Sequence, residues 1–121
     1  MPEWPDIERT VVAWLGTLGR PVYTETGPTT PSEYITVERV GGTGTRIDRD
    51  VDVEISVIAA TRSDLWALVA QVEARVRALA ASGDETYVDD VAETFAFAID
   101  PYPNTTVRRA TATYTLTVRP Q

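Results

Sequence analysis

The chain has 121 residues, a formal net charge of −7, and no cysteine, histidine or lysine, so we expect residues 1–121 to form a single domain. The missing side chains exclude disulfides, thiolate metal sites, histidine general bases and Schiff-base chemistry, which predicts a protein that is not an enzyme and has no cofactor. The acidic balance disfavours tight binding to nucleic acid, and no apolar run or N-terminal signal pattern predicts a membrane span or export.

The first predicted element is a helix between Pro5 and Gly19. Proline suits the first helical turn, Asp6 and Glu8 suit the positive end of the helix dipole, and Gly19 suits the stop. One stripe at helical spacing is apolar and consists of Ile7, Val11, Leu15 and Leu18. We expect this stripe to face the core.

Two strands are predicted next, a short one at residues 22–26 and a longer one at residues 34–40, which is rich in β-forming side chains. The prolines and glycine of residues 27–31 predict a loop between them. Three glycines within residues 41–46 predict a flexible hairpin connection to the strand that follows. They do not form a phosphate cradle, because such sites lead from a strand into a helix.

The strongest pattern is the alternation in residues 47–59. One face is apolar and consists of Ile47, Val51, Val53, Ile55, Val57 and Ala59; the other carries Asp48, Asp50, Asp52, Glu54 and Ser56. Such strict alternation predicts a strand with one buried and one wet face. Carboxylates two residues apart on a strand lie close enough to share a cation, but a calcium site needs a loop that wraps the ion. We therefore interpret the acidic side as a solvated or partner-facing surface rather than a metal site.

A second helix is predicted from a cap at Ser63 to a stop at Gly83. Its apolar seam at helical spacing consists of Leu65, Leu68, Val69, Val72, Val76 and Leu79. The acidic residues that follow could supply a hydrolase pair only within a cleft, which nothing nearby predicts, so we interpret them as a solvated connection. They are Asp84, Glu85, Asp89, Asp90 and Glu93.

Two further strands, joined by a turn at residues 100–104, complete the chain. In the first, one face is expected to carry Val91, Glu93, Phe95, Phe97 and Ile99. In the second, apolar residues alternate with a polar face that carries Arg109, Thr111, Thr113, Thr115 and Thr117. The order of elements predicts an α+β fold, a two-layer sandwich in which an antiparallel or mixed sheet of about four to five strands has two helices packed on one face.

Segments along nearly the whole chain carry a family resemblance. They are Trp4-Pro5-Asp6-Ile7-Glu8 leading to Trp14-Leu15, then Ile35-Thr36-Val37 and the glycine connection, the strand Asp50-Val51-Asp52-Val53-Glu54-Ile55 before the alanine-rich helix, and the final Ala112-Thr113-Tyr114-Thr115-Leu116-Thr117-Val118. In order, length and texture the sequence resembles the tail terminator proteins of siphophages that infect actinobacteria, which are similar in kind to those of lambda-like phages.

The resemblance implies a structural virion protein at the head-proximal end of the tail, assembled in the host cytoplasm. Such a protein forms a homo-oligomeric ring, a hexamer in this family, binds the last ring of the tail tube protein, stops its polymerisation and offers its other surface to the head–tail connector or stopper protein. DNA would pass through the ring without specific binding, since an acidic lining repels it.

Two sets of residues are candidates for these contacts. The acidic residues Asp48, Asp50, Asp52 and Glu54 are expected to face the lumen or a neighbouring subunit. The candidate assembly loop, expected to become ordered on contact with the tube, consists of Gly41, Gly42, Thr43, Gly44, Thr45 and Arg46.

Alternatives stay open at this point. Another phage neck or tail subunit, such as a stopper, head-completion or minor tail protein, would share a ring and a polar sheet face. A small bacterial module that binds a metabolite or peptide would need an apolar concavity, and the aromatic residues are too scattered in the sequence to predict one. An enzyme is the weakest alternative, given the missing histidine, cysteine and lysine.

Overall fold

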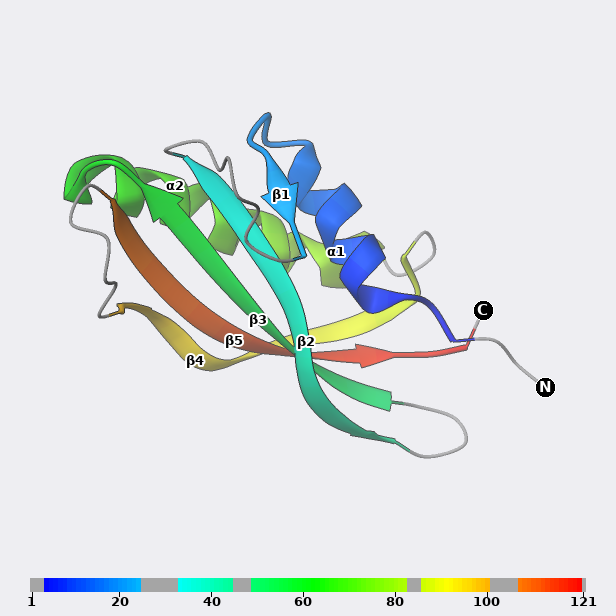
Figure 1. The fold of residues 1–121 in the computed structure, drawn as a ribbon. Helices are drawn as coiled ribbons and strands as arrows, with labels where there is room; N and C mark the ends of the chain where they lie inside the picture. Colours follow the sequence, from blue (N-terminus) through cyan, green and yellow to red (C-terminus); the bar gives the residue numbers. More distant parts are fainter. Residues whose placement is uncertain (1–3, 25–32, 45–48, 83–85, 101–106, 121) are drawn as a thin grey trace.

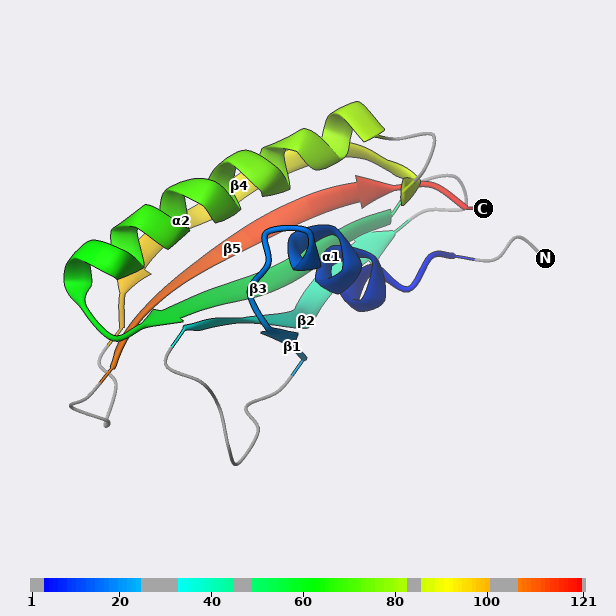
Figure 2. The same cartoon turned by 90° about the horizontal axis from the view of Figure 1, so that it is seen from above.

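The computed structural model describes residues 4–24, 33–44, 49–82, 86–100 and 107–120. It shows an α+β fold in which two helices pack on one face of a five-stranded mixed sheet (Figures 1 and 2), which confirms the predicted fold class. The elements in chain order are α1 (Ile7–Gly16), β1 (Val22–Tyr23), β2 (Tyr34–Gly44), β3 (Arg49–Ala59), α2 (Arg62–Arg77), the short 3-10 helix η1 (Ala78–Ser82), β4 (Val88–Ile99) and β5 (Arg108–Val118).

The strand order in the sheet is β1-β2-β3-β5-β4. The short strand β1 runs parallel to β2, and the other neighbouring pairs are antiparallel. Strands β3 and β4 therefore run in the same direction with β5 inserted between them, and α2 connects the two across one face of the sheet. This split β-α-β arrangement joins the two predicted hairpins into one sheet.

Both helices begin at a side-chain cap. The Asp6 carboxylate accepts the backbone N–H of Arg9 at 3.2 Å at the start of α1, and the Thr61 hydroxyl accepts the N–H of Asp64 at 3.1 Å at the start of α2. The prediction that Ser63 caps the second helix is therefore wrong. Thr61 has the extended backbone (φ −125°, ψ 158°) that a capping residue requires, whereas Ser63 already lies in the first turn. The predicted stop at Gly83 lies outside the described residues.

The core lies between the helices and the inner face of the sheet. The predicted helical stripes are buried there, with Leu18 of the first stripe partly buried. The buried helical side chains are Ile7, Val11, Leu15, Leu65, Leu68, Val69, Val72, Val76 and Leu79. They pack on the inner face of β2, β3 and β5, where the apolar half of each alternating strand is also buried.

Helix α1 is held against α2 by one aromatic–cation contact. The Trp14 indole N–H donates to the Arg75 carbonyl oxygen at 2.6 Å, and the Arg75 guanidinium lies 3.7 Å from the centre of the indole ring. The same guanidinium donates through Nε to the Thr17 hydroxyl at 3.0 Å. These contacts fix the C-terminal half of α1 and so determine where its other side chains reach.

The glycine-rich segment differs from the prediction. Gly41 to Gly44 continue β2, paired with β3, beyond a register shift after Arg39. Gly42 has a φ of +144°, and a Cβ there would collide with the Asp50 backbone oxygen, so glycine permits the close approach of the two strands. The expected loop is thus strand for its first four residues, because a bulge lets the ladder continue. Thr45, Arg46 and Asp48 lie outside the described residues.

The predicted single face of β4 is wrong. The pairing of β4 with β5 shifts register at three places, and each shift inserts residues that change which side chains face the core. As a result Phe95 is 68% exposed, whereas Phe97 is buried and packs edge-on against Tyr114, with ring centroids 6.2 Å apart.

The buried hydroxyl of Tyr114 is expected to change the stability of the folded state with pH. Tyr114 is fully buried, and its hydroxyl has no hydrogen-bond partner among the described residues. Burial, with smaller contributions from Glu93 and Glu73, raises its pKa to about 12. Since the unfolded chain ionises its tyrosines near pH 10, the folded state should lose stability as the pH rises from about 10 to about 12.

We predict that Tyr114→Phe is at least as stable as the wild type at neutral pH, because an unpaired buried hydroxyl costs about 1–3 kcal/mol. The variant should also lose less stability between pH 10 and pH 12. Urea unfolding at neutral and alkaline pH measures both effects. A variant that is less stable at neutral pH would show that the hydroxyl makes a stabilising hydrogen bond.

Candidate functional site

The face of the sheet opposite the helices, here called the open face, is the candidate functional site. The structure places Asp50, Asp52 and Glu54 of the predicted acidic set on it, along one side of β3. Their neighbours across the antiparallel register are Thr117, Thr115 and Thr113 of β5. Because residues directly opposite in such a pair point to the same side, an acidic row and a threonine row run side by side.

Hydrogen bonds join the two rows. The Thr117 hydroxyl donates to the Asp50 carboxylate at 2.9 Å, and the Thr115 hydroxyl donates to the Asp52 carboxylate at 2.7 Å. Thr94 of β4 lies 2.7 Å from the Thr115 hydroxyl. Since Thr115 gives its only hydroxyl proton to Asp52, Thr94 is the donor in that contact. The carboxylates of Asp50 and Asp52 are thus held in fixed positions by neutral donors.

A second network closes the other end of the open face. The Ser56 and Thr111 hydroxyls lie 3.0 Å apart, and Thr111 donates to the Asp100 carboxylate. Arg109 also donates to Asp100, through Nε at 3.1 Å. Each of these hydroxyls therefore has a structural partner.

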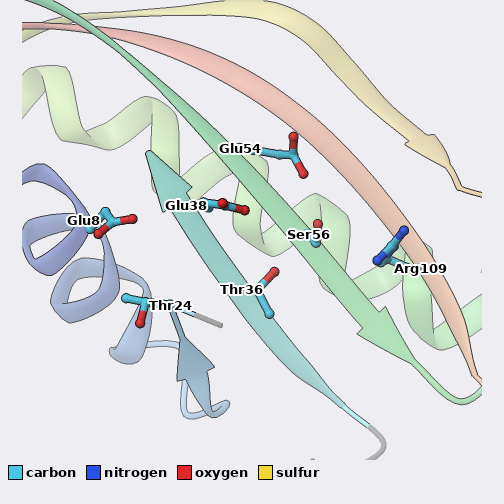
Figure 3. Close-up of a pocket in the computed structure, with 7 residues that line it drawn as sticks. All are labelled: Glu8, Thr24, Thr36, Glu38, Glu54, Ser56 and Arg109. Atoms are coloured by element: carbon cyan, nitrogen blue, oxygen red, sulfur yellow. The ribbon is translucent and has the colours of Figure 1, made fainter. Parts of the chain in front are cut away.

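Beside the second network, towards β2 and α1, the open face is hollowed by a concavity of about 530 Å³ (Figure 3). It is lined by polar side chains from α1, from the residue after β1, and from β2, β3 and β5: Glu8, Thr24, Thr36, Glu38, Glu54, Ser56 and Arg109. The register sets Glu38 directly opposite Glu54, and Glu8 approaches from the outer side of β2. Three carboxylates and one guanidinium suit a charged or strongly hydrated partner, not an apolar metabolite.

Glu8 and Glu38 were missed by sequence reasoning as members of this surface. Glu38 and Thr36 are two residues apart on one strand and therefore point to the same side of the sheet. The alternation of residues 34–38 could have predicted that both belong to the open face. Glu8 was assigned only to the helix dipole. Its carboxylate also accepts the backbone N–H of Arg39 at 2.9 Å, a contact that depends on how α1 packs beside β2. Neither propensity nor periodicity carries that information.

In the part of the chain that the structure describes, no group of three or more acidic side chains is arranged to hold a metal ion. No described helix is long and apolar enough to cross a membrane. What the open face offers chemically is fixed negative charge, hydroxyl groups that are already hydrogen-bonded, and a shallow polar hollow.

The chain is similar in structure to solved proteins, although its sequence matches no family model and no curated protein. A chain in the solved structure described as the virion of a native gene transfer agent particle is similar to this one, with 18% sequence identity and a TM-score of 0.44. The likeness covers 90% of this chain and 84% of that chain. A likeness this distant carries no conclusion about function.

Glu38 and Glu54 lie directly opposite each other, so reversing the charge of Glu38 is expected to increase the stability of the fold. Like charges directly opposite on neighbouring strands are destabilising, and an opposite-charge pair contributes about 0.2–1 kcal/mol. We therefore expect Glu38→Lys to stabilise the fold by about that amount, and Glu38→Gln by less. Thermal unfolding at low and high salt measures the effect, which should shrink as salt screens the charges. An unchanged or lower stability for both variants would show that the two carboxylates do not repel.

Proposed function

We propose that the protein is a structural virion protein, a tail terminator that forms a homo-oligomeric ring on the last ring of the tail tube. It would stop tube polymerisation and provide the surface to which the head connector or stopper joins. The single observation that carries this proposal is the open face. Part of one side of the sheet is open to water and carries Asp50 and Asp52, which threonine hydroxyls hold in place, whereas Tyr34, Ser56 and Ile58 towards the other end of that side are buried.

The geometry of the open face supports assembly over substrate turnover. In a two-layer domain the helices cover one side of the sheet, and the other side is available to solvent or to neighbours. Held carboxylates repel phosphate, so a ring that turned Asp50 and Asp52 toward its lumen would let DNA pass without adhesion. The elements quoted in the resemblance to tail terminators agree with the observed order of helices and strands.

Removing the gene from a genome that encodes this protein tests the proposal. Loss of a tail terminator should produce tails of abnormal length that do not join heads, because nothing stops the tube from growing. Loss of a stopper or head-completion protein should instead leave tails of normal length beside separate heads. Negative-stain electron microscopy of the lysate distinguishes these outcomes. Normal particles would contradict any structural role in the virion.

The lumen assignment makes a separate prediction. Asp50→Asn with Asp52→Asn should leave the fold and the ring intact, because asparagine still accepts the threonine hydrogen bonds. It should slow DNA passage and ejection, because two carboxylates per subunit no longer repel the phosphates. Time-resolved DNA release from purified particles measures this.

A matched control is Ala67→Arg with Gln71→Arg, both exposed on α2. Each double variant changes the formal net charge by the same amount, from −7 to −5. Equal ejection rates for the wild type and the asparagine variant would remove the lumen assignment and leave the role in tail termination standing. Equal slowing in both variants would show that net charge, and not the open face, sets the rate.

A further inference from the structure

The two outer edges of the sheet are unequally protected. Among the described residues, β1 pairs with β2 at Ile35 and Thr36, and from Val37 to Gly44 β2 has a strand neighbour on the β3 side alone. At the opposite side, β4 is the last strand of the sheet. Unpaired edges of this kind present backbone donors and acceptors to any other strand that approaches.

The open parts of the two edges lie at the same level of the sheet. Glu38 of β2 pairs with Glu54, which pairs with Thr113, which pairs with Phe95 of β4. By the same register, Gly44 lies in one row with Arg49, Val118 and Val88. Rows of paired residues therefore run across the sheet from the β2 segment 38–44 to the β4 segment 88–95.

Each edge exposes a large apolar side chain. Val40 of β2 is 48% exposed and Phe95 of β4 is 68% exposed, each beside a register shift. Of the four large apolar side chains found exposed in the described residues, only Trp66 lies away from these two strands, on α2; the fourth, Ile99, ends β4. Both segments also carry charge, at Glu38 and Arg39 of β2 and at Asp89, Asp90 and Glu93 of β4, so Val40 and Phe95 are the apolar contacts that each edge can offer to a partner.

Glu8 blocks one of the edges. Its carboxylate accepts the N–H of Arg39 at 2.9 Å from the side of β2 that faces away from β3, as Figure 3 shows by the position of α1. The bond is charge-assisted and therefore stronger than a neutral one. It occupies a position that a pairing strand would need.

We propose that the edge of β2 from Val37 to Gly44 pairs with the Val88–Phe95 edge of β4 in a second copy of this chain, and that Glu8 is a removable block on that pairing. The inference deepens, and rests on, the proposed ring.

Three antiparallel pairings separate β2 from β4, so a copy that continues the sheet meets β2 in the antiparallel sense. The two edges differ, so the contact is head-to-tail, the kind that closes into a ring when the rotation permits.

The block is tested with purified protein by sedimentation over a series of concentrations. Glu8→Ala frees the Arg39 N–H and should strengthen self-association by about tenfold, the effect of one charge-assisted hydrogen bond. Glu8→Gln keeps an acceptor and should remain close to the wild type. Circular dichroism checks that each variant is folded. Equal association of the wild type and Glu8→Ala would overturn the block.

The surface is tested by a matched pair of substitutions at exposed apolar side chains. Phe95→Glu should abolish the association of the Glu8→Ala variant, whereas Trp66→Glu on α2 should leave it unchanged. Both are also made in the wild-type background, which tests the surface even if Glu8→Ala does not fold. Self-association that survives Phe95→Glu would contradict pairing at β4. So would self-association that Phe95→Glu and Trp66→Glu abolish equally. These results need no particles, so they stand apart from the outcome of the gene deletion.

Discussion

The register between β3 and β5 is the constraint on which the rest of the structure depends. It sets Asp50 opposite Thr117 and Asp52 opposite Thr115 on the open face, while it sets Val51 and Val53 opposite Leu116 and Tyr114 in the core. A slip of one residue would turn the apolar row to water and the acidic row to the helices. The burial of the core therefore also fixes which threonine lies opposite which carboxylate on the open face.

A second consequence concerns the placement of α1. Because Trp14 and Arg75 hold α1 against α2, Glu8 at the other end of α1 is carried to the outer side of β2. The same side chain lines the concavity and covers one donor of the strand edge. The open face and the sheet edge are thus linked through one helix.

The parts of the fold that sequence predicted are those with local signals. The alternation of residues 47–59 with acidic side chains, and of the last strand with threonines, predicted both strands and most of their two faces, but Ser56, which was expected on the wet face, is buried. The pairing of β3 with β5 had no such signal, because it joins strands separated by α2 and β4. The shifts in β4 lie in a segment without glycine or proline, so nothing in the sequence marked Phe95 as exposed.

The candidate site divides in the same way. Asp50, Asp52 and Glu54 were predictable because strand parity places them together. The threonine partners could be assigned to a polar face, but their bonding to specific carboxylates needed the register. Glu8 was beyond sequence reasoning, since a helix side chain reaches a strand edge only through tertiary packing.

A cryo-electron microscopy reconstruction of the particle that carries this protein tests the central claim most directly. The account predicts density for this α+β domain in a closed ring where the tail tube meets the head, with the open face of the sheet turned to the lumen or to a neighbouring subunit. Absence of the chain from the particle, or a ring in which helices α1 and α2 line the lumen and the open face is turned outward to solvent, would contradict it.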